Sequence, residues 1–304
     1  MVDLVPPSLD HLRCFLAVVE EGSFNAAARK LGRAISVVSY AIAQLEAQLD
    51  VRLFDREGSR RPTLTEEGRA LLSEAHAISD DVDALLAKVR SLRQGLEAEL
   101  SLAVDVMLPG NVLARLLRDF QDRFPSVPLR LHVEALGAVA ALALEGRATL
   151  AIAGPDILDL PEIERETIGS VELVAVAAPD HPLARAGRIA SGEARKHLQL
   201  VLTDRSPLTE GRDFSVFSAR SWRLADLGAK HALLKEGIGW GSMPRHVVKG
   251  DLASGALVEL HLPERPVIDY ALVALWRKDS PPGPAALWVL DELRERLMKC
   301  PSSS

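Results

Sequence analysis

The chain has 304 residues, 48% of them apolar, which is enough for two domains with well-packed cores. Its formal net charge of −6 is not the basic balance of many nucleic-acid-binding proteins, and alone it argues against DNA binding. The two cysteines, Cys14 and Cys300, have no metal-site or disulfide spacing, as is typical of proteins from a reducing cytoplasm. The sequence shows no secretion signal and no apolar run as long as a membrane span, so we expect a soluble, cytoplasmic protein.

Two short helices are predicted at the start of the chain. Apolar residues recur there at spacings of three and four, as in an amphipathic helix: Leu9, Leu12, Leu16 and Val19. Gly22 interrupts this pattern, and Ser23 is a good N-cap for a second helix from Phe24 to Leu31.

A third helix is predicted after the turn at Gly32. Its apolar face is formed by Val38, Ile42, Leu45 and Leu49, at helical spacings. The opposite face presents Ser36, Ser39 and Tyr40, polar groups suited to contact base edges in a DNA major groove. The three helices therefore predict a helix-turn-helix.

A wing is predicted next, because two extended segments, 51–56 and 63–65, flank a Gly-Ser turn with Arg60 and Arg61 at its tip. Between residues 29 and 61, seven basic residues outnumber four acidic ones, a modest local excess that is compatible with contacts to phosphates. The predicted DNA-binding residues are Arg33, Ile35, Ser36, Ser39, Tyr40, Arg56, Arg60 and Arg61. Of these, Arg56, Arg60 and Arg61 are assigned to the phosphate backbone.

These motifs resemble the N-terminal domain of LysR-type transcriptional regulators. The matching segments are Glu20–Ala27 (EEGSFNAA), Val38–Ser39, Leu45–Glu46, Leu53–Arg56 (LFDR) and Leu64–Thr65 with Gly68. Members of that family usually have Ser-Gln where this chain has Ala34-Ile35, and often Arg in place of Tyr40. Ala34 lacks a capping hydroxyl worth about 1 kcal/mol. Ile35 either contacts a thymine methyl group or extends the apolar face of Val38 by one turn.

A long helix from Glu66 to about Gln94 is predicted to pair two subunits. Thr65 is its expected N-cap and Gly95 ends it. Its apolar residues follow an unbroken heptad pattern: Leu71, Ala75, Ile78, Val82, Leu85, Val89 and Leu92. The alternative is a helix packed on its own domain, whose apolar face would usually drift from the 3.5-residue period. A twofold dimer would bind a pseudo-palindromic site on double-stranded DNA.

From residue 97 onward, strands alternate with helices, which predicts a two-lobed α/β domain. The predicted strands are 100–106, 129–134, 150–153, 172–178, 198–203, 238–242 and 268–276, and the predicted helices begin at Pro109, Ala138, Leu224 and Ala285. The order of these segments is similar to the effector-binding half of LysR-type regulators, which itself resembles a type 2 periplasmic binding protein. We expect crossings between the lobes near 162–168 and 264–268.

The expected organisation is therefore a winged helix-turn-helix in residues 1–65, a linker helix in 66–95 and an effector-binding domain in 96–304. Within that domain, lobe I would comprise about 96–162 and 268–304, and lobe II about 163–267. The resemblance implies a tetramer rather than a dimer, a small-molecule effector, and contact with RNA polymerase if the protein activates transcription.

Ligands of such α/β folds bind outside the carboxyl ends of the strands. The candidate effector-binding residues at these ends are Asp105, Val106, Met107, Glu134, Ala135, Gly154, Thr203, Asp204, Arg205 and Trp240. Asp105 replaces the Ser or Thr of many relatives, so the effector is expected to be neutral or cationic there, or to be held by Arg205. Alternatively, Asp105 only caps the following helix.

Three other functions were weighed. Catalysis is not expected, because the chain has no glycine-rich phosphate loop, no Ser or Cys nucleophile motif and no His/Cys metal spacing, and so no cofactor or metal is predicted. A stand-alone solute-binding protein would not carry the N-terminal DNA module. The third alternative is a protein-binding module that has lost specific DNA reading, and it is retained because Ile35 and Tyr40 depart from the family pattern.

Overall fold

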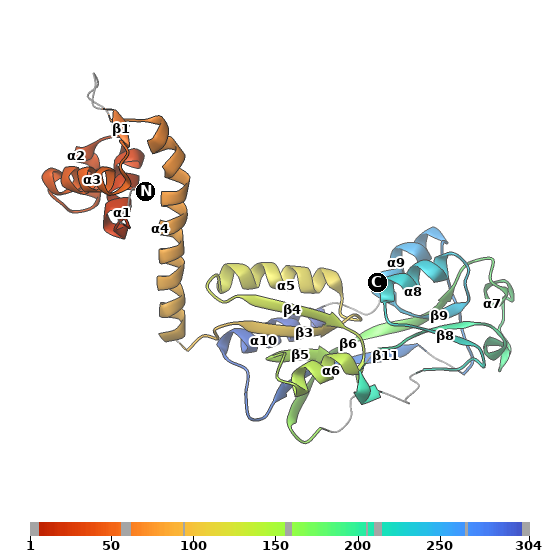
Figure 1. The fold of residues 1–304 in the computed structure, drawn as a ribbon. Helices are drawn as coiled ribbons and strands as arrows, with labels where there is room; N and C mark the ends of the chain where they lie inside the picture. Colours follow the sequence, from red (N-terminus) through yellow and green to blue (C-terminus); the bar gives the residue numbers. More distant parts are fainter. Residues whose placement is uncertain are drawn as a thin grey trace. The chain divides into compact units, whose positions relative to one another are not determined.

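The computed structural model describes residues 6–55, 62–93, 95–155, 160–204, 206–209, 215–264 and 267–299. The chain divides into two compact units, Met1–Arg90 and Ser91–Ser304 (Figure 1). None of the helices within the described residues is both long and apolar enough to cross a membrane.

The first unit is a three-helix domain with two short strands and one long helix. Its elements are α1 (Leu9–Glu21), α2 (Phe24–Lys30), α3 (Ile35–Leu49), β1 (Phe54–Asp55), β2 (Thr63–Leu64) and α4 (Glu66–Arg93). The predicted caps are confirmed, since Ser23 Oγ accepts from Ala26 N at 3.1 Å and Thr65 Oγ1 from Gly68 N at 2.9 Å.

Aromatic packing holds the wing on the helices. The ring of Phe54 in β1 lies 5.6 Å from that of Phe15 and 5.7 Å from that of Phe24, both edge-on. Gly68 lets α4 approach this region closely, because a Cβ at that position would lie 2.3 Å from the carbonyl oxygen of Leu53. The wing segment 56–61, with Arg56, Arg60 and Arg61, lies outside the described residues.

The apolar heptad face of α4 is partly packed within the first unit and partly exposed. Leu71 and Ala75 pack against the core of the first unit. Further along the helix, large apolar side chains are exposed: Ile78, Leu85, Leu86, Val89 and Leu92. The predicted seam is corrected accordingly, because its first two positions serve the unit's own core and only the part from Ile78 onward is accessible to a second helix.

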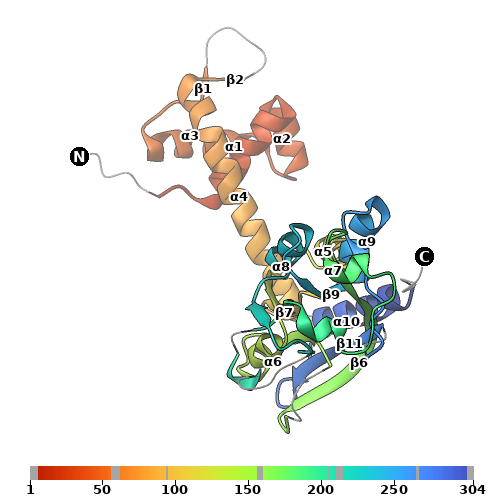
Figure 2. The same ribbon diagram turned by 90° about the vertical axis from the view of Figure 1, so that its right-hand side faces the viewer.

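The second unit contains one nine-stranded sheet flanked by helices (Figure 2). Its first elements are β3 (Leu100–Asp105), α5 (Gly110–Arg123), β4 (Leu129–Glu134), α6 (Gly137–Leu144), β5 (Leu150–Ala153) and β6 (Ile163–Ala177). They are followed by α7 (Pro182–Arg185), η1 (Glu193–Lys196), β7 (Gln199–Leu202), η2 (Pro207–Thr209), β8 (Ser221–Leu224) and α8 (Leu227–Lys235). The last are β9 (Trp240–Pro244), α9 (Arg245–Ser254), β10 (Val258–Glu259), β11 (Ile268–Arg277) and α10 (Pro284–Lys299).

Two long antiparallel strands, β6 and β11, join the lobes. The strand order is β4-β3-β5-β11-β6-β9-β7-β8, with β10 pairing β6. In lobe I, β3 lies between β4 and β5, and in lobe II β9 pairs β6 and β7. This arrangement is the predicted two-lobed α/β architecture, with separate apolar clusters in the two lobes.

Two sequence-based boundaries were wrong. The strand expected at 172–178 begins at Ile163 instead, because the segment where a crossing was expected, near 162–168, is the polar first half of the same strand, β6, and is paired with β11. Backbone hydrogen bonds to β11 hold this half of β6 in the sheet while its charged side chains stay exposed. The sequence there therefore lacks the apolar pattern of a strand. The helix expected from Leu224 begins at Leu227 instead, because Asp226 caps it by accepting from Ala229 N, and Leu224 ends β8.

Candidate functional site

The N-terminal part of α3 presents one face to solvent. The predicted base-contacting residues Ser36, Ser39 and Tyr40 are all exposed, Tyr40 by 64%. Val38, one residue before Ser39, is fully buried. Helical geometry therefore separates the packing face from a face that is available to DNA.

Ile35 lies on the exposed face and not in the core. Its side chain is 47% exposed, so it does not extend the apolar face of Val38. Val37, which the sequence analysis did not select, is exposed to the same extent. Solvent-exposed aliphatic groups at the start of a groove-reading helix suit contact with thymine methyl groups.

Arg33 is engaged within the first unit. Its two terminal nitrogens each donate to a carboxylate oxygen of Asp10 at 2.7 Å. The hydrogen bond from Arg33 lowers the pKa of Asp10 below its ordinary value. This pair is largely solvent-exposed, and such pairs contribute about 1 kcal/mol or less. A phosphate group is therefore able to compete for Arg33 at small cost.

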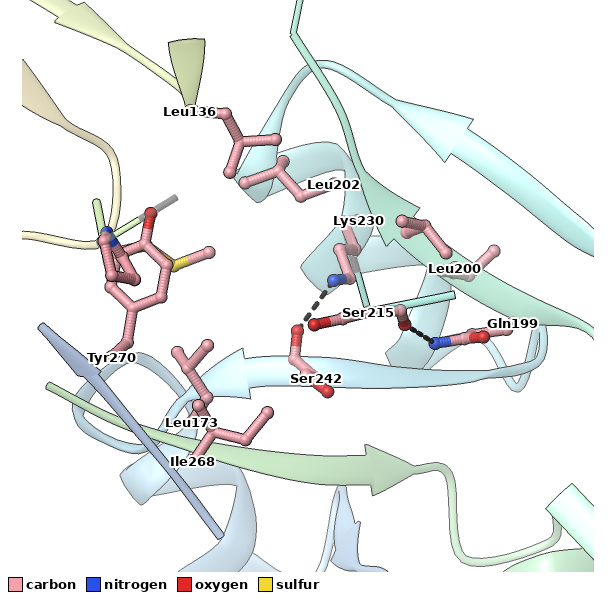
Figure 3. Close-up of a pocket in the computed structure, with 13 residues that line it drawn as sticks. Leu136, Leu173, Gln199, Leu200, Leu202, Ser215, Lys230, Ser242, Ile268 and Tyr270 are labelled. Carbon is pink, nitrogen blue, oxygen red and sulfur yellow. Dashed lines mark hydrogen bonds between the residues drawn. The ribbon is translucent and has the colours of Figure 1, made fainter. Parts of the chain in front are cut away.

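The second unit contains a cavity of about 220 Å³ (Figure 3). Its wall is mostly apolar, with a few polar side chains from lobe II. The lining residues are Met107, Leu136, Pro155, Leu173, Gln199, Leu200, Val201, Leu202, Ser215, Lys230, Ser242, Ile268 and Tyr270. They come from β6 and β11 as well as from both lobes, which is the usual location of a ligand site between two α/β lobes.

Asp105 lies behind the cavity wall. Its side chain is 1% exposed and does not line the cavity, so the expectation of direct effector contact is corrected. The carboxylate accepts from Met107 N at 2.8 Å, Leu136 N at 3.2 Å and Tyr270 Oη at 3.1 Å. Burial raises the pKa of this carboxyl to about 6, against the lowering effect of these hydrogen bonds.

The alternative role of Asp105, capping the following helix, is also corrected. The N-cap of α5 is Pro109, with no side-chain hydrogen bond. The partners of Asp105 are instead three residues that line the cavity. One of them, Leu136, has a φ of +51°, a conformation that costs a non-glycine residue energy. Asp105 is therefore a positioning residue for the lobe I side of the cavity.

The other effector candidates lie in different environments. Met107 lines the cavity. Near it, Val106 and Ala135 pack on the core of lobe I, Glu134 is exposed at the end of β4, and Gly154 faces the Tyr270 hydroxyl. Thr203 and Asp204 are half-buried beyond β7, where Asp204 accepts from Thr209 Oγ1. Arg205 lies outside the described residues.

Trp240 is another candidate that does not line the cavity. It is fully buried, and its Nε1 donates to the carbonyl oxygen of Ala194 at 3.2 Å. The same face of β9 reaches the cavity two residues later, at Ser242. The strand predicted at 238–242 overlaps β9, which is Trp240–Pro244, but the residue selected on it does not reach the cavity.

Lys230 is the main cavity residue that sequence reasoning missed. It is only 3% exposed, and its Nζ donates to the carbonyl oxygen of Ser242 at 2.7 Å (Figure 3). The available signal was its spacing, since Lys230 lies three residues after Leu227 and four before the buried Leu234 on α8. A lysine is almost never fully buried unless it is paired, so its position on this face marks an unusual environment.

Among the described residues, no group of three or more His, Cys, Asp or Glu side chains is positioned to hold a metal ion.

Known proteins resemble the whole chain. Residues 9–69 match the model of the bacterial regulatory helix-turn-helix protein, lysR family, and residues 93–298 match that of the LysR substrate binding domain. The chain is 28% identical over 297 residues to the HTH-type transcriptional regulator AceR of Acinetobacter baumannii, covering 95% of this chain and 97% of that protein. It is 30% identical over 295 residues to the probable HTH-type transcriptional regulator YhaJ of Escherichia coli, covering 94% and 95%.

A solved structure shows the same fold. The Corynebacterium glutamicum OxyR C206 mutant aligns with a TM-score of 0.58 and 19% identity, over 98% of this chain and 95% of that one. With both family models matched in order, the chain belongs to the LysR family of DNA-binding transcriptional regulators that carry an effector-binding domain.

Proposed function

We propose that this LysR-family regulator reads DNA through the exposed face of α3 and changes its DNA binding when a small molecule occupies the cavity between the two lobes. The observation that carries the DNA role is the exposure of Ile35, Ser36, Ser39 and Tyr40 beside the buried Val38. Arg33, Arg56, Arg60 and Arg61 would supply phosphate contacts. The protein would act in the cytoplasm as a regulator and not as an enzyme.

We also propose that two chains pair through α4. The support is the row of exposed apolar side chains from Ile78 to Leu92, because a soluble helix rarely leaves such a row uncovered. Two paired chains would place two copies of α3 on a pseudo-palindromic site. A tetramer, and contact with RNA polymerase when the protein activates transcription, would follow the same family pattern.

Effector control would operate as a shift between conformations. The cavity wall includes residues from both lobes, so a ligand in it contacts both at once. A ligand that binds one arrangement of the lobes more tightly than another shifts the population toward it by its difference in affinity.

The test begins with selection of binding sequences from fragmented genomic DNA, followed by fluorescence anisotropy against scrambled DNA across a salt series. The double variant Ser36→Ala/Ser39→Ala should lose about tenfold or more of its sequence preference, because each lost base contact costs about 1 kcal/mol or more. Its salt dependence should stay unchanged, since phosphate contacts set that slope.

The matched control is Ser73→Ala/Ser79→Ala, which removes two hydroxyl groups from α4 and should leave the preference intact. If the wild-type chain prefers no DNA sequence at low salt, the proposed function is refuted, and a protein partner for α3 becomes the better hypothesis. If both double variants weaken the preference equally, the role assigned to the α3 face is wrong.

A further inference from the structure

Among the described residues that line the cavity of the second unit, the polar side chains other than Tyr270 come from lobe II. Lys230 and Ser242 lie together at one end, on α8 and β9, while Leu136, Leu173, Ile268 and other apolar side chains form the rest of the wall (Figure 3). Gln199 also lines this end, but its side-chain oxygen accepts from Phe217 N and Ser218 N. Its amide nitrogen donates to the carbonyl oxygen of Ser215.

Lys230 brings a positive charge to a place where charge is costly. Its side chain is 3% exposed, and an ammonium group removed from water is stable only when oxygen atoms surround it. The carbonyl oxygen of Ser242 is one such atom, at 2.7 Å from Nζ. A ligand oxygen with negative charge at this end would add a charge-assisted hydrogen bond to a buried ammonium group.

Ser242 supplies the second observation. Its hydroxyl oxygen is buried and has no hydrogen-bond partner within the part of the chain that the structure describes. Buried hydroxyl groups are nearly always bonded, so such an exception needs an explanation. A ligand oxygen bound beside Lys230 would accept from this hydroxyl and provide its partner.

The lobe I end of the cavity has the opposite electrostatic character. Tyr270 lines it, but the Tyr270 hydroxyl donates to the carboxylate of Asp105 directly behind the wall. The nearby carboxylate of Asp204 interacts unfavourably with that of Asp105. A second negative group on a ligand at this end would lie near the buried carboxylate of Asp105 behind the wall, which disfavours it, whereas an apolar group would be accepted.

The size of the cavity indicates how large a group it can enclose. An apolar cavity of about 150 Å³ accommodates benzene, and this cavity measures about 220 Å³. One ring or a short aliphatic chain fits beside a single acidic group.

We infer that the effector is a small, mainly apolar monocarboxylic acid, whose carboxylate binds Lys230 and Ser242 while its apolar part faces Leu136, Leu173 and Tyr270. This inference rests on the proposed function, because it names the ligand class of the same cavity. It distinguishes monoacids from dicarboxylates, amines and neutral molecules of the same shape.

The experiment is isothermal titration calorimetry on the full-length chain with matched probes. The monoacids are phenylacetate, 3-phenylpropanoate, cyclohexanecarboxylate and hexanoate, each paired with its primary amide. Glutarate and terephthalate are the dicarboxylates, and phenethylamine is the cation. At least one monoacid should bind about tenfold or more tightly than its amide, because a hydrogen bond to a charged group is worth about that much in affinity. Dicarboxylates should bind more weakly than that monoacid.

Two variants locate the contact. Lys230→Met keeps the apolar stem and should lower the affinity for the monoacid about tenfold or more, to the level of the amide. Ser242→Ala, which removes only the hydroxyl, should lower it several-fold and serves as the second test if Lys230→Met does not fold. Unliganded melting temperature and binding to the selected DNA are measured for each variant as controls.

The ligand class is overturned if amides, dicarboxylates or the amine bind as tightly as the monoacids, if no monoacid in the series binds, or if the monoacid affinity survives in both variants. These results would leave sequence-preferring DNA binding intact, so they are distinguishable from failure of the proposed function. The proposed function is refuted only if the wild-type chain prefers no DNA sequence, whichever acids bind.

Discussion

The start of α3 lacks a side-chain cap, and restoring one should stabilise the first unit. Ala34 is the N-cap residue, with φ −72° and ψ 148°, and it makes no side-chain hydrogen bond. Ser8, at the start of α1, has nearly the same angles, φ −77° and ψ 144°, and its hydroxyl accepts from His11 N at 3.1 Å. A serine at position 34 should therefore accept from Val37 N, which also donates to the carbonyl oxygen of residue 34 at 3.0 Å.

The expected gain is about 1 kcal/mol for Ala34→Ser, the typical contribution of a serine N-cap. The first unit extends over residues 1–90. For a domain of about 60–100 residues, 1 kcal/mol corresponds to a rise in melting temperature of roughly 4–8 °C. It also corresponds to about a fivefold shift of the equilibrium between the folded and opened states.

The assay must report on the first unit alone. All four tryptophans, Trp222, Trp240, Trp276 and Trp288, lie in the second unit, so their fluorescence does not follow α3. Hydrogen–deuterium exchange measured by mass spectrometry resolves peptides from α1 to α3 in the full-length chain. In the Ala34→Ser variant these peptides should exchange about fivefold more slowly where exchange requires opening of the unit.

Ala43→Ser is the matched control. Ala43 is exposed in the middle of α3, where a serine caps nothing and slightly disfavours the helix. A capping role for position 34 is refuted if the peptides of the Ala34→Ser variant exchange no more slowly than those of the wild type, or if Ala43→Ser protects the same peptides equally.

Three further changes test other parts of the chain. Because burial raises the pKa of Asp105 from 3.8 to about 6, the folded chain keeps a proton that the unfolded chain has lost between these values. The free energy of unfolding should thus fall by about 1 kcal/mol from pH 5 to pH 7 in tryptophan-monitored denaturation. Asp105→Asn should lack this component, and an unchanged pH slope would contradict it. Gly154→Ala would place a Cβ 1.8 Å from Tyr270 Oη and should destabilise the second unit by about 1–3 kcal/mol. Gly110→Ala, whose Cβ meets no atom within 4 Å, should leave the stability of the second unit nearly unchanged. Both glycine variants are compared with the wild type in thermal melts. Leu85→Glu should convert a dimer to monomers in light scattering, because Leu85 is 59% exposed on the accessible part of the α4 seam. A dimer that persists would mean that α4 is not the interface.

Local sequence signals were sufficient to place the helices of the first unit. Its helices begin within a residue of the predicted positions because Ser23 and Thr65 cap them through contacts only three residues away. The buried face of α3 follows from helical spacing alone. The missing cap at Ala34 was also readable, since it depends on the identity of one residue.

Other features needed the fold. The sequence left Ile35 between two environments, and only the packing of the first unit showed that it is exposed. The polar half of β6 resembled a connection because its pairing partner, β11, lies about a hundred residues away in the chain. Hydrogen bonding between distant strands leaves no local pattern.

The two-lobed architecture and the position of candidate strand ends were accessible from alternating helices and strands. The ligand site itself was not, because Met107, Lys230 and Tyr270 come from three separate regions of the chain and meet only when the lobes assemble. The same assembly buries Asp105 behind the wall and Trp240 in a core, although both lie within predicted strands. Periodicity determines which residues share the face of one element, whereas the packing of elements against each other decides which faces enclose a cavity.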